Sequence, residues 1–523
     1  MDQLLTGHVF SKDAHSTTLP PLQITGTATN CPGTAALPSD EGKTAAWADA
    51  PASAGIPGGP EMPSPSILDG RIPSRKEADV TRDRNSHRLK SSALLVAACL
   101  GWGLGLPIGP SSSPTSFAAE MLAASVSSIT AEDAARHVSA LADDALEGRE
   151  GGTRGGRAAA AYIVEQIEAL GFEPAGDAGS YYQPFGAGLR NILALLPGSD
   201  PDLAREVVVI GAHYDHVGYG NAGNSFGPFG FVHNGADDNA SGVAGLIEIM
   251  EALRRLPERP RRSILVAFWD GEEKGLLGSS HFLRVQPQAL AGRPLVFSLN
   301  LDMIGRLRDE RVVVYGARTA TGLRGRLAAT NTEPASGAGL HLAFDWDILE
   351  DSDHYPFIAA RIPTLMLHTG LHDQYHRPSD DVELVNVAGI PLVCRLALAL
   401  TTDIADAPEP LAFRGGSRSE SNATRRRLEE ARPPGGPSQG RWGIVSRADP
   451  GEPQTPIVVH VARDSPAERA GLQAGDRLHA VDGLSFADQP AMVERLRTAG
   501  DSCRLLIERH GRLQELGVHA TAN

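Results

Sequence analysis

The chain has 523 residues, 41% of them hydrophobic, which is enough for a sizeable core and, at roughly 150 residues per domain, for about three units. The formal net charge of -15 argues against a nucleic-acid partner, which would favour a basic surface. The four cysteines form no CxxC pair, so neither a cysteine zinc site nor a disulfide framework is supported. Any bound metal must therefore take histidine and carboxylate ligands.

The amino-terminal part of the chain has the composition of a tail followed by a targeting signal. Residues 1–87 are rich in Pro, Gly, Ser, Thr and Ala and are expected to be disordered. Residues 88–119 have a basic start, an apolar run and a small-residue site at 116–118, which is the layout of a secretory signal. This predicts a periplasmic or secreted protein. The alternatives are a retained membrane anchor, a lipoprotein signal at Cys99, and a translation start downstream of Met1.

Residues 129–403 change character and predict an α/β domain. Thr130 opens a helix as part of a capping box, and a second helix over 157–170 stops at Gly171. An amphipathic helix is expected at 242–256. Four apolar runs are typical of buried strands, namely 207–210, 264–268, 296–301 and 364–367. Because strand, helix, strand is the parallel crossover unit, we expect a mixed, mostly parallel sheet flanked by helices.

The remainder of the chain divides into a linker and a second domain. Residues 404–438 contain a proline- and glycine-rich run and three consecutive arginines, with little that is apolar, and are expected to form a linker. Residues 440–520 are expected to form a small final domain.

Acids or histidines follow each predicted strand. They are His213 and Asp215 after the first strand, Asp270, Glu272 and Glu273 after the second, Asp302 after the third, and His368, His372, His376 and Asp380 after the fourth. Asp237 and Asp238 lie just before the crossover helix. Taken singly, each has a structural explanation, such as helix N-terminal acids favoured by the dipole. Because ligands bind outside the carboxyl ends of strands in open α/β sheets, however, these side chains are expected to converge.

Three carboxylates and two imidazoles form a donor set that suits zinc. One catalytic zinc takes three protein ligands, so five ligands fit two ions about 3.5–4 Å apart that share a bridging carboxylate. Such a pair would polarise a peptide carbonyl and activate water, and a nearby carboxylate would act as general base.

Residues 129–403 resemble the di-zinc aminopeptidases of the aminopeptidase Y and bacterial leucyl aminopeptidase type, which are related to glutamate carboxypeptidase. The resemblance lies in motifs that occur in the family's order: LEGR from position 146, GAHYDHVGYG from 211, NGADDNASG from 234, WDGEEKGLLGS from 269, NLDMIGR from 300, SDHYPF from 352 and TGLHDQYHRPSDD from 369. It implies a zinc exopeptidase fold that removes N-terminal residues from peptides or proteins with two zinc ions.

The resemblance also implies a set of metal ligands. His213 and Asp302 correspond to the ligands of one zinc, Glu273 and His376 to those of the other, and Asp238 to the bridge between them.

Four further residues take roles from the same resemblance. Glu272 corresponds to the general base, and Tyr375 to a tyrosine that stabilises the oxyanion in some relatives. Asp215 and Asp380 are expected to orient the two zinc-binding histidines.

The chain departs from the family pattern in one segment. The stretch between the first ligand and the bridge is long and rich in Gly, Asn and Phe, and is expected to form a loop over the rim of the site. His368 and His372 are additional ligand candidates, disfavoured because the five-ligand set is already complete.

Residues 440–520 resemble the β-rich PDZ domains of bacterial high-temperature-requirement and tail-specific proteases. The matching motifs are IVVHV from position 457, SPAERAGL from 465, GDRL from 475 and VDG from 481. PDZ domains add a peptide as an extra strand and hold its terminal carboxylate in backbone amides, so a C-terminal peptide ligand is expected. Trp442, Gly443 and Ile444 are the candidate carboxylate loop. The alternative is a packing module without a ligand.

Three other functions compete with the aminopeptidase interpretation. A catalytically inactive protein that binds peptides through its PDZ domain would have lost ligands or the base, all of which are present here. A transferase like glutaminyl cyclase uses one zinc and needs fewer ligands. Carboxypeptidase or dipeptidase activity on the same fold stays open, because specificity lies in loops that the sequence does not position.

Overall fold

The computed structural model describes residues 124–334, 336, 338–431 and 440–520. The predicted tail (1–87) and the predicted signal (88–119) lie outside the described residues. Within the described ranges, no helix is both long and apolar enough to cross a membrane.

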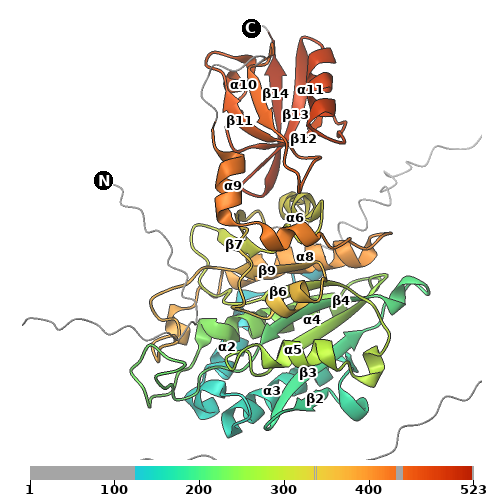
Figure 1. Ribbon diagram of the computed structural model, residues 1–523. Coiled ribbons are helices and arrows are strands. Elements are labelled where there is room, and N and C mark those ends of the chain that lie inside the picture. Colours follow the sequence, from blue (N-terminus) through green and yellow to red (C-terminus); the bar gives the residue numbers. More distant parts are fainter. Residues whose placement is uncertain (1–123, 335, 337, 432–439, 521–523) are drawn as a thin grey trace, which may run out of the picture. The chain divides into compact units, whose positions relative to one another are not determined.

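Nine strands of the described chain form one mixed sheet in the order β1-β3-β5-β4-β6-β9-β7-β8, with β2 beside β3 (Figure 1). The strands are β1 (Glu173–Pro174), β2 (Tyr182–Phe185), β3 (Leu189–Leu196), β4 (Val207–His213), β5 (Ser263–Trp269), β6 (Leu295–Leu301), β7 (Arg311–Tyr315), β8 (His341–Asp345) and β9 (Thr364–His368). The four predicted runs are β5, β4, β6 and β9, which pair in parallel at the centre. Antiparallel neighbours β3 and β7 flank them, which confirms a mixed α/β sheet.

Helices cover both faces of the sheet, because the central strands have apolar side chains on both of their faces. In β4, Val208 and Ile210 pack in a core with α2 (Ala131–Leu141), α3 (Arg154–Leu170), α4 (Gly242–Arg254), α6 (Leu323–Thr332) and α8 (Ile390–Asp406). The alternate residues Val207 and Val209 pack in a second core with α5 (Leu277–Arg284) and α7 (His354–Ala359). Successive side chains of a strand point to opposite faces, so one continuous apolar run serves both layers.

Local signals explain where the first two helices begin and end. The Thr130 hydroxyl accepts a hydrogen bond from the Asp133 amide at 3.1 Å, which caps the first turn of α2 as the sequence predicts. Gly171 ends α3 in the left-handed region, with φ of 69°. A residue without a Cβ adopts that conformation at little cost.

The expected linker, 404–438, is partly helical. Helix α8 continues to Asp406, and a short helix, α9 (Asn422–Glu429), lies within the described part of this stretch. The Ser421 side chain caps α9 by accepting from the Thr424 amide. No side chain of α9 is buried, so the segment gives no apolar periodicity from which a helix could be predicted.

The carboxyl-terminal domain is a five-stranded antiparallel sheet in the order β10-β11-β12-β13-β14. Its elements are β10 (Ile444–Arg447), β11 (Ile457–Val461), α10 (Pro466–Arg469), β12 (Arg477–Val481), α11 (Gln489–Thr498), β13 (Ser502–Arg509) and β14 (Arg512–His519). It has its own core, which includes Trp442 and Leu505. Strand β10 lies at one edge of the sheet.

Candidate metal centre

The sheet brings the predicted ligands together at one edge. His213 ends β4, Glu273 lies four residues after β5, and Asp302 directly follows β6. His376 lies in the loop after β9, and Asp238 lies in a π-helical turn, η4 (Ala236–Ser241), that leads into α4. These positions all follow the carboxyl ends of the central parallel strands, where α/β sheets place their ligands.

The first cluster contains one imidazole and two carboxylates. His213 Nε2 lies 3.3 Å from Asp238 Oδ1 and 3.6 Å from Asp302 Oδ1. The donor atoms of these three residues all lie within 4.8 Å of one another.

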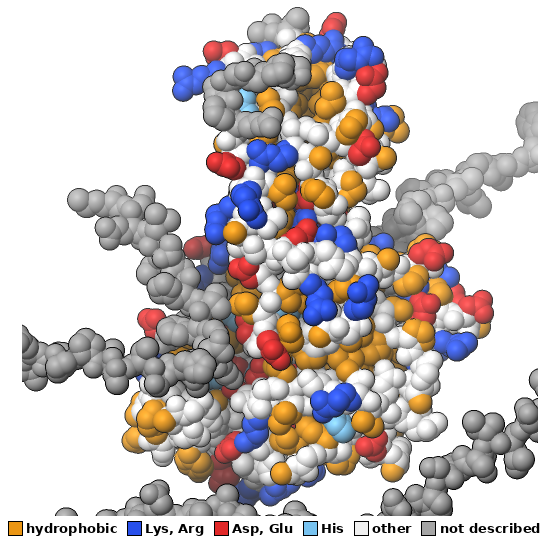
Figure 2. Space-filling view, in the orientation of Figure 1, with side chains coloured by type: hydrophobic (Ala, Val, Ile, Leu, Met, Phe, Trp, Pro, Cys, Tyr) orange, Lys and Arg blue, Asp and Glu red, His pale blue; other side chains and the backbone are white. Residues whose placement is uncertain are grey.

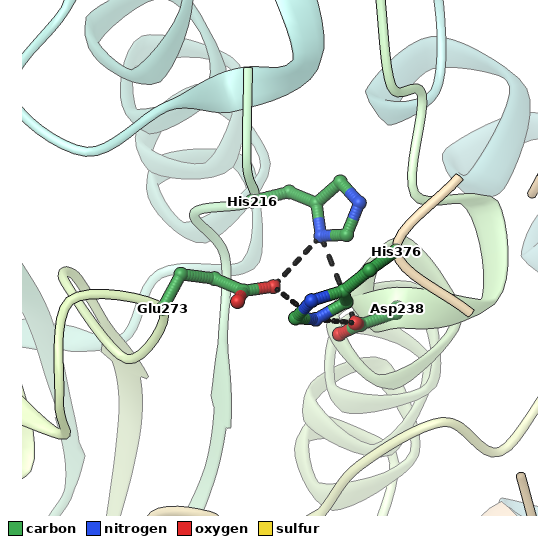
Figure 3. A group of neighbouring side chains, drawn as sticks. All are labelled: His216, Asp238, Glu273 and His376. Carbon is green, nitrogen blue, oxygen red and sulfur yellow. Dashed lines mark hydrogen bonds and ion pairs between the residues drawn. The ribbon is translucent and has the colours of Figure 1, made fainter. Parts of the chain in front are cut away.

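The second cluster contains two imidazoles and two carboxylates (Figure 3). His376 Nε2 lies 3.1 Å from Asp238 Oδ2 and 3.2 Å from Glu273 Oε1. His216 Nδ1 lies 2.9 Å from the same Glu273 oxygen and 3.7 Å from the same Asp238 oxygen. The two oxygens of Asp238 thus face different clusters.

The clusters are buried and their groups perturb one another strongly. Burial lowers the pKa of His376, but Glu273 and Asp238 raise it to a net value of about 11. Burial raises the pKa of Glu273, but His376 lowers it to a net value of about 2. For His213, burial opposes protonation, while Glu272 and Asp238 raise the net pKa well above its usual value. The buried carboxylates therefore favour positive charge close to them, which a bound cation would supply.

This donor set fits zinc. The six side chains of the two clusters are between 0% and 11% exposed, and buried carboxylates are stable only when paired or bound to a metal. Imidazole and carboxylate are the donors that zinc takes in catalytic sites.

Asp380 does not occupy the position predicted for it. Its carboxylate accepts hydrogen bonds from the backbone amides of Asp237 and Asp238, both at 3.0 Å, and pairs with Arg306 at 3.0 Å. The structure therefore places Asp380 behind the turn that carries Asp238, and it forms no described hydrogen bond with the side chain of His376.

The remaining predicted residues lie around the clusters. Asp215 Oδ1 accepts from the Glu272 amide at 3.1 Å and lies 3.9 Å from His213 Nδ1. The ring of Tyr375 stacks on that of His376, with centroids 3.9 Å apart. Burial raises the pKa of Glu272 well above its usual value, although His213 lowers it.

His368 and His372 have other partners. His372 Nε2 lies 3.1 Å from Asp237 Oδ2, and His368 Nδ1 accepts from the Gly370 amide at 2.7 Å. Neither belongs to a metal-competent cluster of the described residues.

Two residues of the site were missed from the sequence, His216 and Arg149. His216 lies three residues after His213, and the repeated imidazole in HYDH was the available signal. Arg149 is 1% exposed and donates to four backbone carbonyls, those of Leu141, Tyr214, Asn234 and Gly235, at 2.6 to 3.0 Å. The sequence shows an arginine in LEGR but nothing of these partners.

The predicted rim loop lies beside the second cluster. The Phe226 amide donates to the His376 carbonyl at 3.1 Å, and the Phe226 ring centroid lies 6.2 Å from that of Tyr375. Phe226, Phe229 and Phe231 are each more than half exposed. Figure 2 shows hydrophobic side chains at the left-hand edge of this domain, where Figure 1 draws the green loop. The loop therefore presents an apolar surface close to the second cluster.

The predicted carboxylate loop, residues 442–444, leads into the edge strand β10. Trp442 and Ile444 are buried in the core of the domain, and Trp442 Nε1 donates to the Leu496 carbonyl at 2.7 Å. Gly443 has a positive φ of 77°, and a Cβ there would meet the Ser465 side chain at 2.2 Å. Because these side chains face the core, only backbone groups of the loop could hold a carboxylate.

The chain thus has a mixed α/β sheet with buried imidazoles and carboxylates at the ends of its parallel strands, in two groups that could hold metal ions. Residues 191–401 match the model of peptidase family M28, and residues 457–509 match that of the PDZ domain. The chain contains a peptidase family M28 domain followed by a PDZ domain.

The similar curated proteins include peptidases. The chain is 28% identical to leupeptin-inactivating enzyme 1 of Streptomyces exfoliatus, over 42% of this chain and 44% of that protein. It is 29% identical to aminopeptidase YwaD of Bacillus subtilis, over 35% of this chain and 37% of that protein. The chain thus spans less than half the length of these relatives. The LapA aminopeptidase of Legionella pneumophila is a similar solved structure, with 19% identity and a TM-score of 0.46 over 55% of this chain and 76% of that one.

Proposed function

We propose that this chain is an aminopeptidase that removes N-terminal residues from peptides or proteins with two zinc ions bound on either side of Asp238. The observation that carries the proposal is the orientation of that carboxylate. Its Oδ1 lies 3.3 Å from His213 Nε2 and its Oδ2 lies 3.1 Å from His376 Nε2, so each oxygen belongs to a separate donor cluster.

The surrounding residues supply the side chains that this mechanism of peptide hydrolysis uses. Two zinc ions bound here would polarise the scissile carbonyl and make water a nucleophile at neutral pH. Glu272 is the proposed general base, which takes a proton from the attacking water and passes it to the leaving amine. Burial raises the pKa of Tyr375 well above its usual value, so its hydroxyl stays protonated and can donate to the developing oxyanion. Asp215 contacts both the Glu272 amide and His213, and so fixes the proposed base and the proposed ligand relative to each other.

Metal analysis of the purified protein, together with a panel of aminoacyl-nitroanilides, tests this proposal. We expect two zinc ions per chain and hydrolysis of substrates with a free α-amine, lost on chelation and restored by zinc. N-acetylated versions of the same substrates are the control, because an aminopeptidase requires the free amine. Cleavage of amino-blocked peptides from the carboxyl end would instead support carboxypeptidase activity. Absence of both zinc and hydrolysis would support a peptide-binding protein without catalysis.

A second proposal concerns the PDZ domain, which we infer binds the carboxyl end of a peptide along strand β10. The support is that β10 is an edge strand, with Trp442, Gly443 and Ile444 at its start. Gln489 Nε2 donates to the Ser446 carbonyl at 2.6 Å, so a bound peptide must displace this side chain. Fluorescence anisotropy with labelled apolar peptides tests the inference: binding that disappears when the terminal carboxylate is amidated supports it, and equal binding of both forms contradicts it.

We also propose that the protein acts outside the cytoplasm. The support is the signal-like sequence over 88–119. Amino-terminal sequencing of protein recovered from the periplasm or medium is expected to show a chain that begins shortly after residue 118. Retention of residues 88–119 in a membrane fraction would instead indicate an anchor.

A further inference from the structure

His216 is buried beside the second cluster although the five-ligand set does not include it. Its side chain is 0% exposed, and its Nδ1 points at the oxygens of Glu273 and Asp238 that also face His376. Figure 3 shows the four side chains converging from separate segments of the chain.

Two other backbone segments, at Arg149 and at Gly235, hold the His216 ring in this position. The His216 amide donates to the Arg149 carbonyl at 3.2 Å. On the other side, Gly235 lies so close that a Cβ there would meet His216 Cδ2 at 2.5 Å. Gly235 also has a positive φ of 55°, so glycine is favoured there both for space and for conformation.

The donor spacing of the second cluster is that of a tetrahedral zinc site. Zinc bonds to nitrogen and oxygen of about 2.0–2.1 Å imply donor-to-donor edges of about 3.3–3.4 Å. The four contacts measured between the imidazole nitrogens of His216 and His376 and the oxygens of Glu273 and Asp238 are 2.9, 3.1, 3.2 and 3.7 Å. All four donor atoms lie within 4.8 Å of one another.

The first cluster offers one donor fewer. Its three side-chain donors come from His213, Asp238 and Asp302. Zinc sites closed by four protein ligands are typically structural, whereas sites with three keep a position for water or substrate.

From this geometry we propose that His216 is a fourth side-chain ligand of the second metal position, which makes the two positions unequal. His216, His376, Glu273 and Asp238 would close in an ion with four donors, so that ion would exchange slowly. His213, Asp238 and Asp302 would leave an open position on theirs, so that ion would exchange faster. This inference rests on the proposed two-zinc function.

The competing explanation is that His216 only donates a hydrogen bond to Glu273 and so orients it. Two substitutions separate these roles, because Asp and Asn both place an atom where Nδ1 lies, three bonds from the Cα. His216→Asp supplies a zinc ligand but no donor, and it adds a negative charge that only a cation can offset. His216→Asn keeps an amide donor for Glu273 but supplies no strong zinc ligand. The matched control is His233→Asn, since His233 is a buried ring whose contacts are with the Ser225 hydroxyl and the Phe231 carbonyl.

The experiment measures zinc content and zinc affinity by competition with a chelator, with circular dichroism as the check on folding. We expect wild type and His233→Asn to release one zinc quickly and one slowly. We expect His216→Asn to weaken zinc binding at the second position, beside His376, by at least ~100-fold. This is the upper end of what loss of an orienting partner costs. His216→Asp is expected to stay within ~10-fold of wild type, a loss no larger than the lower end of that range.

The order of the two variants decides the outcome. The ligand role is wrong if zinc at the second position binds more weakly to His216→Asp than to His216→Asn. It is also wrong if His216→Asn has the same zinc affinity as the wild type. Should neither variant fold, zinc X-ray absorption of the wild-type protein counts the imidazole ligands instead. A total of three imidazoles bound to the two zinc ions supports His216 as a ligand, and a total of two refutes it. A wild type that binds two zinc ions and hydrolyses aminoacyl substrates while His216→Asn is unchanged refutes only this inference. A wild type without zinc refutes the proposed function itself.

Discussion

Replacing Arg149 with methionine should loosen the metal centre without touching a metal ligand. Its guanidinium donates to the carbonyls of Tyr214, Asn234 and Gly235, so it joins the segment after His213 to the turn that carries Asp238. Burial lowers the pKa of Arg149 to about 10, so the side chain remains a cation at neutral pH. Methionine keeps a similar stem but provides no donors.

The cost can be worked out from these contacts. Four carbonyls lose their partner, and at about 1–1.5 kcal/mol for each hydrogen bond the loss is about 4–6 kcal/mol. Burial of the apolar methionine side chain returns about 1–2 kcal/mol. We therefore expect Arg149→Met to lower the free energy of unfolding by about 2–5 kcal/mol, a large part of the 5–15 kcal/mol typical of a folded protein.

Urea unfolding followed by circular dichroism, together with zinc analysis, measures this effect. The control is Arg157→Met, because Arg157 is an exposed arginine that donates to a single carbonyl and should change stability by no more than about 0.5 kcal/mol. If Arg149→Met unfolds within about 1 kcal/mol of wild type and keeps its full zinc content, the organising role of this residue is refuted.

Three further predictions address the site and the core. Glu272→Gln should retain both zinc ions but lose at least about 100-fold in kcat, as expected for a general base, and unchanged turnover would refute that role. Asp238→Ala should lose both metal binding and activity, because it removes the shared ligand; a zinc-loaded, active variant would contradict the bridge. Burial raises the pKa of Glu248 from 4.5 to about 7. The folded state therefore holds a proton that the unfolded state releases between these values, and stability falls as pH rises through this window. Glu248→Gln should match wild type near pH 4.5 and exceed it by up to about 3 kcal/mol at pH 8, measured by urea unfolding, and an equal difference at both pH values would argue against the raised pKa.

Much of the fold was predictable because the central strands are apolar on both faces. Strands β4, β5, β6 and β9 could be predicted from the apolar composition of their sequences alone. The convergence of acids and histidines followed from chain direction in a parallel sheet. Strand β3 was not predicted, although residues 192–196 form an apolar run like those of the four predicted strands. Its buried polar Asn191 bonds to Gln183, eight residues away, and to the Gly278 carbonyl, 87 residues away, and the second of these partners leaves no periodic signal in the sequence.

The details of the site depended on contacts that the sequence does not reveal. The His216 amide bonds to the Arg149 carbonyl, and Gly235 leaves room for the His216 ring beside the cluster. Asp380 was assigned to His376, its neighbour in the chain, but the structure pairs it with the amide of Asp238, 142 residues away. In both cases the deciding interaction joins segments that only the folded sheet brings together.

Anomalous diffraction at the zinc edge, from crystals grown with zinc, tests the central claim most directly. Two peaks about 3.5–4 Å apart are predicted, one on each side of the Asp238 carboxylate. A single peak, or peaks away from both His213 and His376, would contradict the account.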